Sequence, residues 1–360
     1  MSTIKVLHVI ARMNVGGTAR YVEELVKNIP NSALATGHVQ DAEVEDPAVE
    51  SLPVFRIPHL GRRISPIADF KAWRELSNVV REQKPAILHT HTFKAGLIGR
   101  LVRGKHVRVH TFHGHLFDDY SFSKLEKFFI TFAERLLAKR TDFLVSVGQE
   151  VGERLRARKI GSNKNWASVA PGVKEIPLMN KTRARMELDI FESGLLIGWM
   201  ARMAQVKNPY LLLEVALGLP TTQFVMAGGG DLLDEIRLSA PENVKVIGWA
   251  NPSIFLSAVD IIVSTSSNEG MPIALIEAQL AGLPVIATDV GSTKEVIDDK
   301  VTGLIVENNG ENIVNAIERL KISPSFAKEL GKSGRIRANL EFNTQRMLIA
   351  YLNIYQKLAK

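Results

Sequence analysis

The chain has 360 residues, of which 46% are hydrophobic and 23% are charged, and it contains no cysteine. This composition is typical of a globular protein with about two domains and not of a disordered chain. Zero cysteines exclude a disulfide framework and thiolate metal sites, and fit a reducing compartment. The sequence lacks a run of about 18 apolar residues, and its N-terminus lacks the features of a signal peptide, so we expect a cytoplasmic protein.

Positive charge is concentrated in the first half of the chain. Residues 1–175 hold 27 Lys and Arg against 18 Asp and Glu, whereas the remaining residues hold 18 against 20. Much of the excess comes from Arg56, Arg62, Arg63, Arg100, Arg103, Lys105 and Arg108. Such a cluster can attract an anionic membrane surface, nucleic acid or an acidic ligand, and a solvated basic face is the plain alternative. Nucleic acid is not expected as a partner because no recognised binding motif accompanies the charge.

Short β-rich runs alternate with amphipathic stretches along the first part of the chain. The pattern predicts strands at residues 4–10, 86–89, 107–111, 143–146 and 166–170. It predicts helices at residues 18–28, 94–102, 123–138 and 149–158. Residues 31–50 show no clear periodicity, and residues 171–185 are predicted to link two domains.

The alternation continues in the second part of the chain. The predicted strands are residues 195–200, 223–227, 244–247, 260–264, 285–287 and 303–306, and the last predicted helices are residues 312–321, 325–340 and 343–358. Strands that alternate with helices favour parallel sheets built of βαβ units. We therefore expect an α/β protein with two doubly wound, Rossmann-like domains, residues 1–172 and 173–342, facing across a cleft. The helix at residues 343–360 is expected to pack back on the first domain.

Glu269 and Glu277 are eight residues apart in the segment EGMPIALIEAQLAGLPVIATDVG. Pro272 suits the first turn of a helix, so we predict a helix over residues 272–281 with Glu269 in the loop before it. Glu277 would lie about five residues into that helix, or roughly 7.5 Å along it, which is about the reach from a sugar past a diphosphate to a ribose. The helix N-terminus can bind the phosphates, and Gly270 lets the backbone come close to them. Two surface glutamates flanking an ordinary αβ unit are the alternative.

Two cations follow the first predicted strand of the second domain. Arg202 offers a rigid bidentate donor for phosphate, and Lys207 adds a compact charge. The sequence has no Asp-x-Asp motif to hold a metal between diphosphate oxygens, so a departing diphosphate would be neutralised by protein cations and a helix terminus. Two exposed loop cations are the alternative.

Glycines follow several predicted strands. Gly16 and Gly17 open a helix whose N-terminus can bind an anion, although a tight structural turn also explains them. The turn at residues 228–231 has the same two explanations. Gly248 follows a strand that can offer backbone groups to a base.

Histidines gather near two predicted strands of the first domain. His113 follows a strand, where an imidazole can exchange a proton with a sugar hydroxyl, and His115 is a second candidate. His110 is predicted to belong to the strand, whereas His89 and His91 end the preceding strand and are expected to be closer to polar loop residues. A structural histidine is the alternative at every one of these positions.

Residues 269–289 resemble the Glu-x7-Glu signature of the retaining family-4 glycosyltransferases, which have the two-domain GT-B fold. Arg202 followed by Lys-Asn-Pro, and the Thr-Phe-His sequence ending at His113, also match that family. The glycine pair and the turn at residues 228–231 resemble the loops that the family places near the donor. The resemblance covers almost the whole chain and is strongest over residues 199–289.

The resemblance implies a retaining, metal-independent hexosyltransferase whose leaving phosphate oxygen can itself act as the base. A UDP-sugar is favoured as the donor because it is the family's commonest one, and a glycan or lipid-linked sugar is the expected acceptor. Synthesis of cell-surface polysaccharide at the inner face of the membrane follows from this. The implied catalytic residues are His113, Glu269, Arg202 and Lys207, and the implied donor-binding residues are Gly16, Gly17, Gly229, Gly248, Gly270, Met271, Pro272, Ile273 and Glu277. No metal ligand and no cofactor is expected.

Other functions use the same donor-binding residues. Epimerisation or hydrolysis of a nucleotide sugar would change only the fate of the sugar. A non-catalytic nucleotide-sugar-binding subunit is a further alternative. Such a subunit would not need all five of these residues: Glu269, Glu277, Arg202, Lys207 and His113. A dehydrogenase is least favoured, because the first glycine loop lacks the dinucleotide-binding spacing and no acidic residue follows the second strand.

Overall fold

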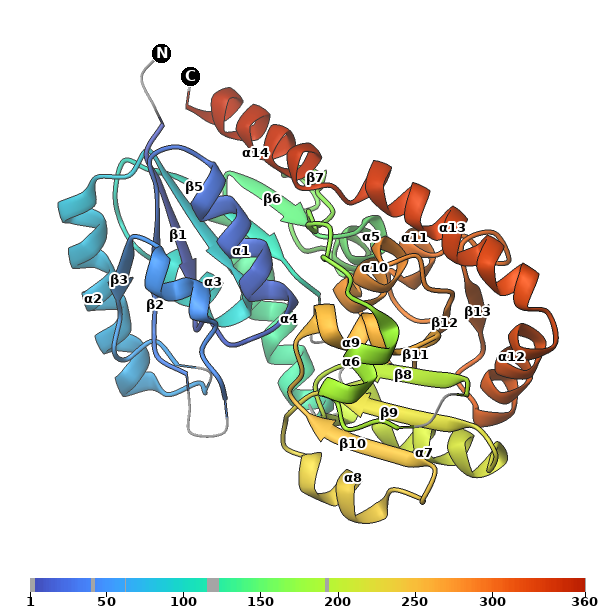
Figure 1. Cartoon of the computed structure of the whole chain (residues 1–360). Helices are drawn as coiled ribbons and strands as arrows, with labels where there is room; N and C mark the ends of the chain where they lie inside the picture. Colours follow the sequence, from blue (N-terminus) through green and yellow to red (C-terminus); the bar gives the residue numbers. More distant parts are fainter. Residues whose placement is uncertain (1–3, 40–42, 62, 115–122, 192–193, 360) are drawn as a thin grey trace. The chain divides into compact units, whose positions relative to one another are not determined.

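The protein is described by a computed structural model for residues 4–39, 43–61, 63–114, 123–191 and 194–359. The chain divides into two compact units. Unit 1 comprises Met1–Gly172 together with Thr344–Lys360, and unit 2 comprises Val173–Asn343. Each unit contains one parallel sheet with helices packed on it (Figure 1).

The sheet of unit 1 has seven strands in the order β3-β2-β1-β4-β5-β6-β7. The strands are β1 (Val6–Ile10), β2 (Ser32–Thr36), β3 (Val54–Arg56), β4 (Ile87–His91), β5 (Val107–Phe112), β6 (Phe143–Ser146) and β7 (Asn165–Ser168). The strand order reverses between β1 and β4, which pair in parallel. In doubly wound sheets this reversal marks the place where ligands bind, beyond the carboxyl ends of the strands.

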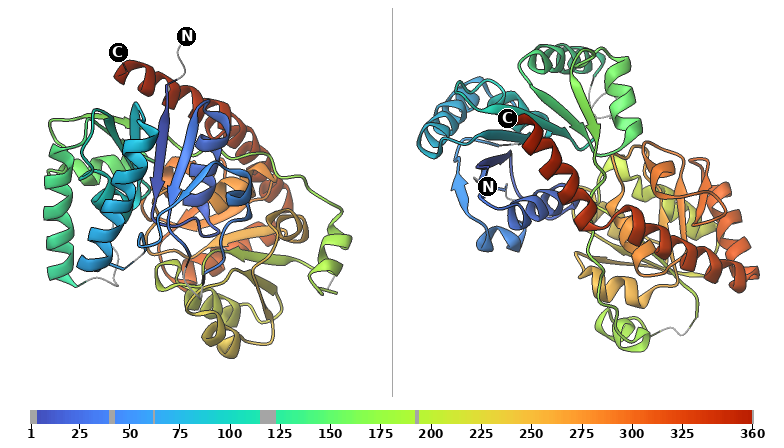
Figure 2. Two further views of the ribbon diagram at one scale, coloured as in Figure 1. Left: turned by 90° about the vertical axis from the view of Figure 1, so that its left-hand side faces the viewer. Right: turned by 90° about the horizontal axis from the view of Figure 1, so that it is seen from above.

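Helices cover both faces of this sheet. They are α1 (Gly17–Asn28), α2 (Pro66–Gln83), α3 (Thr92–Gly99), α4 (Lys124–Lys139), α5 (Gln149–Ala157) and α14 (Thr344–Leu358), with a short 3₁₀ turn at Pro47–Ser51. Leu7 and Val9 of β1 pack in one core with α2 and α3. Because side chains alternate along a strand, His8 points to the opposite face, where its ring lies near Tyr355 of α14. The last helix of the chain, drawn in red beside α1, is therefore part of unit 1 (Figures 1 and 2).

The sheet of unit 2 has six strands in the order β10-β9-β8-β11-β12-β13. The strands are β8 (Leu196–Met200), β9 (Gln223–Ala227), β10 (Val244–Gly248), β11 (Ile261–Ser264), β12 (Val285–Thr288) and β13 (Leu304–Val306). Its helices are α6 (Lys181–Glu187), α7 (Pro209–Gly218), α8 (Leu233–Ser239), α9 (Pro252–Ala258), α10 (Ile273–Leu280), α11 (Thr293–Val296), α12 (Gly310–Ile322) and α13 (Pro324–Glu341), with a 3₁₀ turn at Gln205–Lys207. A large core formed around Trp199 and Phe224 joins the sheet to these helices.

The predicted strands are confirmed to within a few residues, and several other segments differ from the prediction. Residues 31–50 contain β2, and α2 and β3 were not predicted. The linker prediction is wrong at its end, because the side chain of Asn180 accepts a hydrogen bond from the backbone N–H of Arg183 and starts α6. The helix predicted from Pro272 begins one residue later, with Pro272 as its N-cap. None of the described helices is both long and apolar enough to cross a membrane.

Candidate functional site

The loop after β8 carries Lys207 and is tied to the end of β11. Thr265 is the centre of this connection: its hydroxyl accepts a hydrogen bond from the indole N–H of Trp199 at 2.9 Å. The same hydroxyl lies 3.0 Å from the carbonyl oxygen of Lys207 and 2.9 Å from that of Asn208. The backbone N–H of Ser267 also donates to the carbonyl of Val206 at 2.9 Å. Two strand ends that are neighbours in the sheet thus hold the backbone of Lys207 in place.

Lys207 and Glu269 form an ion pair at this place. The ammonium nitrogen of Lys207 lies 2.6 Å from Oε1 of Glu269, and the hydroxyl of Ser266 donates to the same oxygen at 2.6 Å. The side chain of Glu269 is only 8% exposed, whereas that of Lys207 is 24% exposed. Among the described residues, Lys207 and Ser266 both donate to Oε1, so Oε2 is the oxygen that can accept from a ligand hydroxyl. Lys207 and Glu269 are 62 positions apart, and in the sequence only the family resemblance connected them.

Gly291 fixes the backbone of Glu269, and sequence reasoning did not single it out. Gly291 has a φ of +49°, and a Cβ built on it would lie 1.9 Å from the carbonyl oxygen of Glu269. Only glycine allows this approach without displacing the loop. The signal in the sequence was a glycine three residues beyond the strand that ends at Thr288.

Helix α10 carries the second glutamate. It spans eight residues, Ile273–Leu280, and Glu277 is buried within it with 4% of its surface exposed. Gly270, Met271 and Pro272 form the approach to the helix. The N–H groups of the first turn have no partner within the helix itself and carry its partial positive charge. The predicted arrangement of a loop glutamate, a helix N-terminus and a helix glutamate is therefore present in unit 2.

The glycine turn after β9 packs tightly against the loop that carries Arg202. A Cβ built on Gly228 would lie 1.8 Å from the carbonyl oxygen of Ala201, and one built on Gly229 would lie 2.2 Å from the indole nitrogen of Trp249. The N–H of Gly228 donates to the carbonyl of Gly248 at 2.6 Å. Close packing of neighbouring loops therefore explains these glycines, as the structural alternative predicted. Arg202 itself is half buried beside this turn.

Gly16 and Gly17 lie at the start of α1 in unit 1. Gly16 is the N-cap of the helix, with a φ of +154°, and Gly17 is its first residue. A Cβ on Gly16 would meet only the carbonyl oxygen of Asn14, at 3.9 Å, among the described residues. Unlike the glycines of the turn after β9, Gly16 is not needed for close packing, and its φ of +154° is the feature that favours glycine here.

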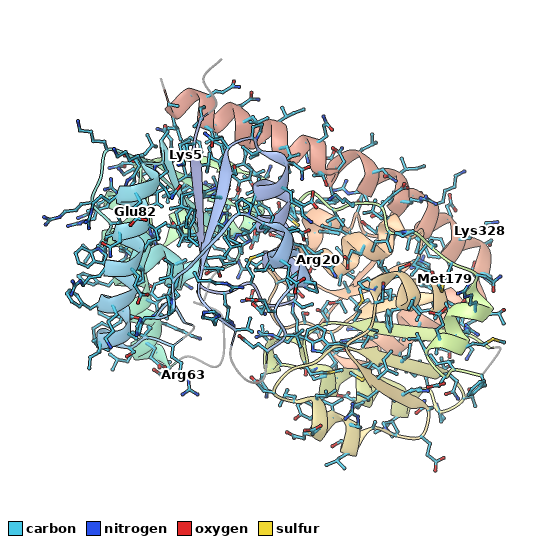
Figure 3. The ribbon with its side chains drawn as sticks, turned by 60° about the vertical axis from the view of Figure 1, so that its left-hand side comes forward. Lys5, Arg20, Arg63, Glu82, Met179 and Lys328 are labelled. Carbon is cyan, nitrogen blue, oxygen red and sulfur yellow. The ribbon has the colours of Figure 1, made fainter. Side chains whose placement is uncertain are left out.

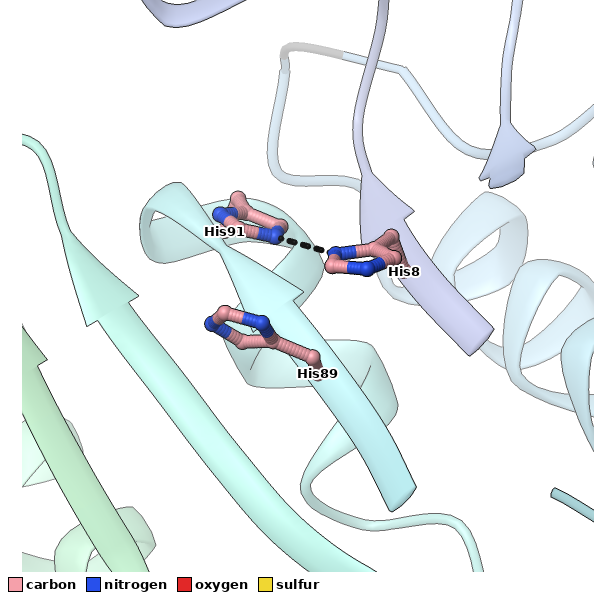
Figure 4. A group of neighbouring side chains, drawn as sticks. All are labelled: His8, His89 and His91. Carbon is pink, nitrogen blue, oxygen red and sulfur yellow. Dashed lines mark hydrogen bonds between the residues drawn. The ribbon is translucent and has the colours of Figure 1, made fainter. Parts of the chain in front are cut away.

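His113 follows β5, is half buried, and belongs to a chain of imidazoles whose other two members, His91 and His8, are fully buried. Its Nε2 lies 3.1 Å from Nδ1 of His91, and Nε2 of His91 lies 3.1 Å from Nδ1 of His8. Figure 4 shows His8, His89 and His91 on neighbouring strands, with the bond between His8 and His91 dashed. His89 and His91 lie in the second half of β4, close to the predicted end of that strand, but both are fully buried, so the expectation that they are close to polar loop residues is wrong. His110 lies in β5 as predicted.

Burial keeps this chain of imidazoles neutral. Desolvation lowers the pKa of His8 to about 3 and lowers the pKa values of His91 and His113 as well. A neutral imidazole has one donor nitrogen and one acceptor nitrogen. The two hydrogen bonds therefore couple the three tautomers, so that all three protons are on Nδ1 or all three are on Nε2. The proton position on His113, at the end of the chain of imidazoles, is therefore set by His8 and His91.

His8, His89 and His91 are also close enough to be considered as metal ligands, since one ring nitrogen from each lies within 4.8 Å of the others. Both nitrogens of His89 already form hydrogen bonds, with Tyr355 at 2.6 Å and with Thr111 at 2.7 Å. Ligation would break one of these bonds and would place an ion among buried neutral groups. The residues therefore fit a hydrogen-bond network better than a metal site.

The predicted basic segment is only partly a charged surface. Arg56 forms two hydrogen bonds with Glu45, at 2.7 and 2.8 Å. Arg100 is buried and pairs with buried Glu134 at 2.8 Å. Arg62 and the second histidine candidate, His115, lie outside the described residues. The exposed members of the cluster are Arg63, Arg103 and Lys105.

Related glycosyltransferases resemble this chain in sequence over nearly its whole length. The UDP-Gal:alpha-D-GlcNAc-diphosphoundecaprenol alpha-1,3-galactosyltransferase of Escherichia coli is 28% identical over 344 residues, which cover 89% of this chain and 88% of that protein. The O-antigen biosynthesis glycosyltransferase WbnH of Escherichia coli is 25% identical over 354 residues, covering 96% of this chain and 97% of that protein.

Solved structures share the fold. A sucrose-phosphate synthase from Thermosynechococcus elongatus has a TM-score of 0.83 at 18% identity and covers 99% of both chains. The HepE protein of Anabaena in complex with UDP-glucose has a TM-score of 0.83 at 14% identity, covering 98% of this chain and 100% of that one. These likenesses show the GT-B fold, with its two Rossmann-like domains.

Two family models match adjoining parts of the chain. The model described as "Glycosyl transferase 4-like domain" matches residues 16–172, and the model described as "Glycosyl transferases group 1" matches residues 180–337. Together they cover most of both units and include every candidate residue named above. The chain therefore belongs to the family-4, group 1 glycosyltransferases and is a glycosyltransferase with the GT-B fold.

Proposed function

We propose that this glycosyltransferase moves a sugar from a UDP-sugar to a lipid-linked glycan, with retention of configuration and without a metal ion. Unit 2 binds the donor and unit 1 provides the acceptor side. The observation that carries the proposal is the pair of Lys207 and Glu269, which lies beyond the carboxyl ends of β8 and β11, next to the N-terminus of α10.

Each side chain of this site has a role in the proposed reaction. Glu277 accepts hydrogen bonds from the ribose hydroxyls, and the first turn of α10 binds the diphosphate. Glu269 accepts a hydrogen bond from a sugar hydroxyl through Oε2, while Lys207 and Ser266 hold Oε1. Arg202 and Lys207 stabilise the charge that grows on the β-phosphate as the bond to the sugar breaks. This charge is greatest in the transition state, so the stabilisation accelerates the reaction and does more than bind the donor.

Retention follows from attack on the face that the diphosphate leaves. A phosphate oxygen of the leaving group takes the proton of the acceptor hydroxyl, so no protein carboxylate is needed as a base. His113 contacts a sugar hydroxyl near the reacting carbon, with its proton position set by His91. The protein cations and the helix terminus together replace the metal ion that an Asp-x-Asp motif would hold.

The acceptor proposal is supported by what the relatives act on. The Escherichia coli relative is named for UDP-Gal and for an acceptor carried on diphosphoundecaprenol. Other relatives are named for O-antigen or capsular polysaccharide biosynthesis. A polyprenyl diphosphate acceptor is found in a membrane, so the protein would work at a membrane surface.

The donor assignment is tested by calorimetric titration with UDP, GDP and ADP, first without metal and then with magnesium. We expect UDP to bind most tightly and its affinity to be independent of magnesium. Glu277→Ala should weaken UDP binding, and Arg202→Ala should slow turnover more than it weakens binding. Tighter binding of GDP or ADP would change the donor, a magnesium requirement would refute the metal-independent mechanism, and near-normal kinetics for both variants would refute the site.

A further inference from the structure

Helix α4 of unit 1 has two apolar faces. One face packs into the fold through buried Ile130, Leu137 and Ala138. The other face is exposed to solvent, and it consists of Leu125, Phe128, Phe129, Phe132 and Leu136, with exposed fractions of 66%, 61%, 59%, 51% and 47%. We call these five residues the α4 stripe.

The stripe is continuous along the helix. At 3.6 residues per turn, the five side chains lie within an arc of roughly 100°, on the side opposite the buried residues. The beginning of the helix is fixed by a capping box: the hydroxyl of Ser123 accepts from the backbone N–H of Glu126, and the Glu126 carboxylate accepts from the backbone N–H of Ser123. The stripe is therefore presented by a regular helix with a well-defined N-terminus.

The stripe is as large as the largest apolar patches found on soluble monomers, which are often functional. Phe and Leu side chains have on the order of 150–200 Å² each, so these exposed fractions leave on the order of 500 Å² of apolar area uncovered. Contiguous patches of this size mark interaction sites on soluble proteins. Scattered single apolar residues need no such explanation, but five on one face of one helix do.

Cations accompany the stripe. Lys124, Arg135, Lys139 and Arg140 are exposed on or next to α4. The carboxylates of the helix do not balance them, because Glu134 points inward to its buried partner Arg100. The stripe is therefore apolar with a positive border, which is the composition of a helix that lies in the headgroup region of an anionic bilayer.

The neighbouring helix adds to the same layer of the unit. Helix α3 contacts both α2 and α4, and the beginning of α2 exposes Ile67 and Phe70 at 74% and 58%. Arg63, labelled in Figure 3, lies in the chain just before α2 and is exposed. Ile64 beside it is 63% exposed. A second, shorter group of apolar and basic side chains is thus exposed at the beginning of α2, which α3 separates from α4.

We propose that the α4 stripe docks unit 1 on an anionic lipid bilayer, with the aromatic side chains among the acyl chains and the cations at the headgroups. A second copy of the chain fits less well, because a two-fold contact through the stripe would bring the same cations of both copies together. The inference rests on the proposed function for its purpose, since a lipid-linked acceptor is reached from a membrane surface. The α4 stripe is a different surface from the basic segment that the sequence suggested for membrane contact. Part of that basic segment forms ion pairs within the fold.

The test uses the full chain and vesicles without any sugar substrate. Phosphatidylcholine vesicles, with and without phosphatidylglycerol, are floated on a density gradient with the purified protein. We expect the protein to float with the anionic vesicles and less with phosphatidylcholine alone. Phe128→Gln with Phe132→Gln should lower the partition constant about tenfold or more, because two half-exposed aromatic side chains no longer enter the bilayer. Lys139→Gln with Arg140→Gln should reduce binding at low salt more than at high salt.

The matched control is Phe191→Gln, which removes an 82% exposed phenylalanine from unit 2 and should leave vesicle binding unchanged. Equal binding of the native chain and the Phe128 and Phe132 variant would overturn the proposal. A concentration-dependent dimer that this variant abolishes, without any vesicle binding, would assign the stripe to a protein contact instead. The nucleotide titration needs no membrane, and the vesicle experiment needs no nucleotide. A negative vesicle result therefore does not affect the donor-site proposal, and a negative titration does not affect the docking result.

Discussion

Replacing Gly291 by Ala tests whether the loop after β12 positions Glu269, the glutamate to which the proposed mechanism gives a catalytic role. Gly291 has a φ of +49°, and a Cβ at this position would lie 1.9 Å from the carbonyl oxygen of Glu269 and 2.9 Å from its carbonyl carbon. The matched control is Gly282→Ala. Gly282 has a φ of +77°, but the nearest atom to its Cβ is Cδ of Arg335, at 3.8 Å. Both substitutions impose the left-handed backbone on an alanine, and only the first adds a collision.

The expected magnitudes follow from these two terms. An alanine in the left-handed region costs about 1–2 kcal/mol, which both variants share. Overpacking against backbone adds about 1–3 kcal/mol for Gly291→Ala alone. For a domain of this size, 1 kcal/mol corresponds to roughly 2–4 °C in Tm. We therefore expect Gly291→Ala to melt roughly 2–12 °C below Gly282→Ala.

The collision should also appear in the activity of the site. A displaced Glu269 would lose a charge-assisted hydrogen bond to the donor sugar, which is worth about 1.5–3 kcal/mol, or roughly 10- to 150-fold in affinity. Scanning calorimetry measures the first effect, and titration with the UDP-sugar measures the second. If Gly291→Ala and Gly282→Ala have the same Tm and the same donor affinity, the close approach of the loop to Glu269 does not hold the site together.

Three further predictions test the ion pairs and the histidines. The effects of Lys207→Met and Glu269→Gln on the turnover rate should not add, and a double-mutant cycle should give a coupling energy of about 1.5–3 kcal/mol. Additive effects would contradict the 2.6 Å contact between the two side chains. Arg100→Met leaves the buried carboxylate of Glu134 without its cation and should lower the free energy of unfolding, measured with denaturant, by about 3–5 kcal/mol. Adding Glu134→Leu should restore most of that stability. Equal stability of the single and double variants would refute this reasoning. Burial lowers the pKa of His8 to about 3, so the unfolded chain binds more protons than the folded one between pH 3 and 6.5. The free energy of unfolding should therefore fall as the pH drops through this window, and His8→Asn should reduce the dependence of that free energy on pH. An unchanged pH dependence in the variant would contradict the neutral buried imidazole.

Local periodicity was sufficient to predict most of the strands and the helices between them, because the interior of a parallel sheet requires short apolar runs followed by turns. Strand β9 was predicted at residues 223–227 and is found at Gln223–Ala227. Strand β2, by contrast, is the sequence SALAT, whose small residues carry little periodic signal. Its strand conformation depends on pairing with β1 and β3, which are distant in sequence.

The amino-acid sequence by itself determined the composition of the candidate site: two glutamates at a fixed spacing, a helix start between them and two cations after an earlier strand. Tertiary structure alone decided which of these groups touch, since Lys207 meets Glu269 only because β8 and β11 are neighbours in the sheet. It also decided that His8, His91 and His113 form one hydrogen-bonded chain, and that five apolar residues of α4 remain outside the core. The physical reason is that a sequence pattern records the neighbours along a helix or strand, whereas strand order and helix packing choose the neighbours across them.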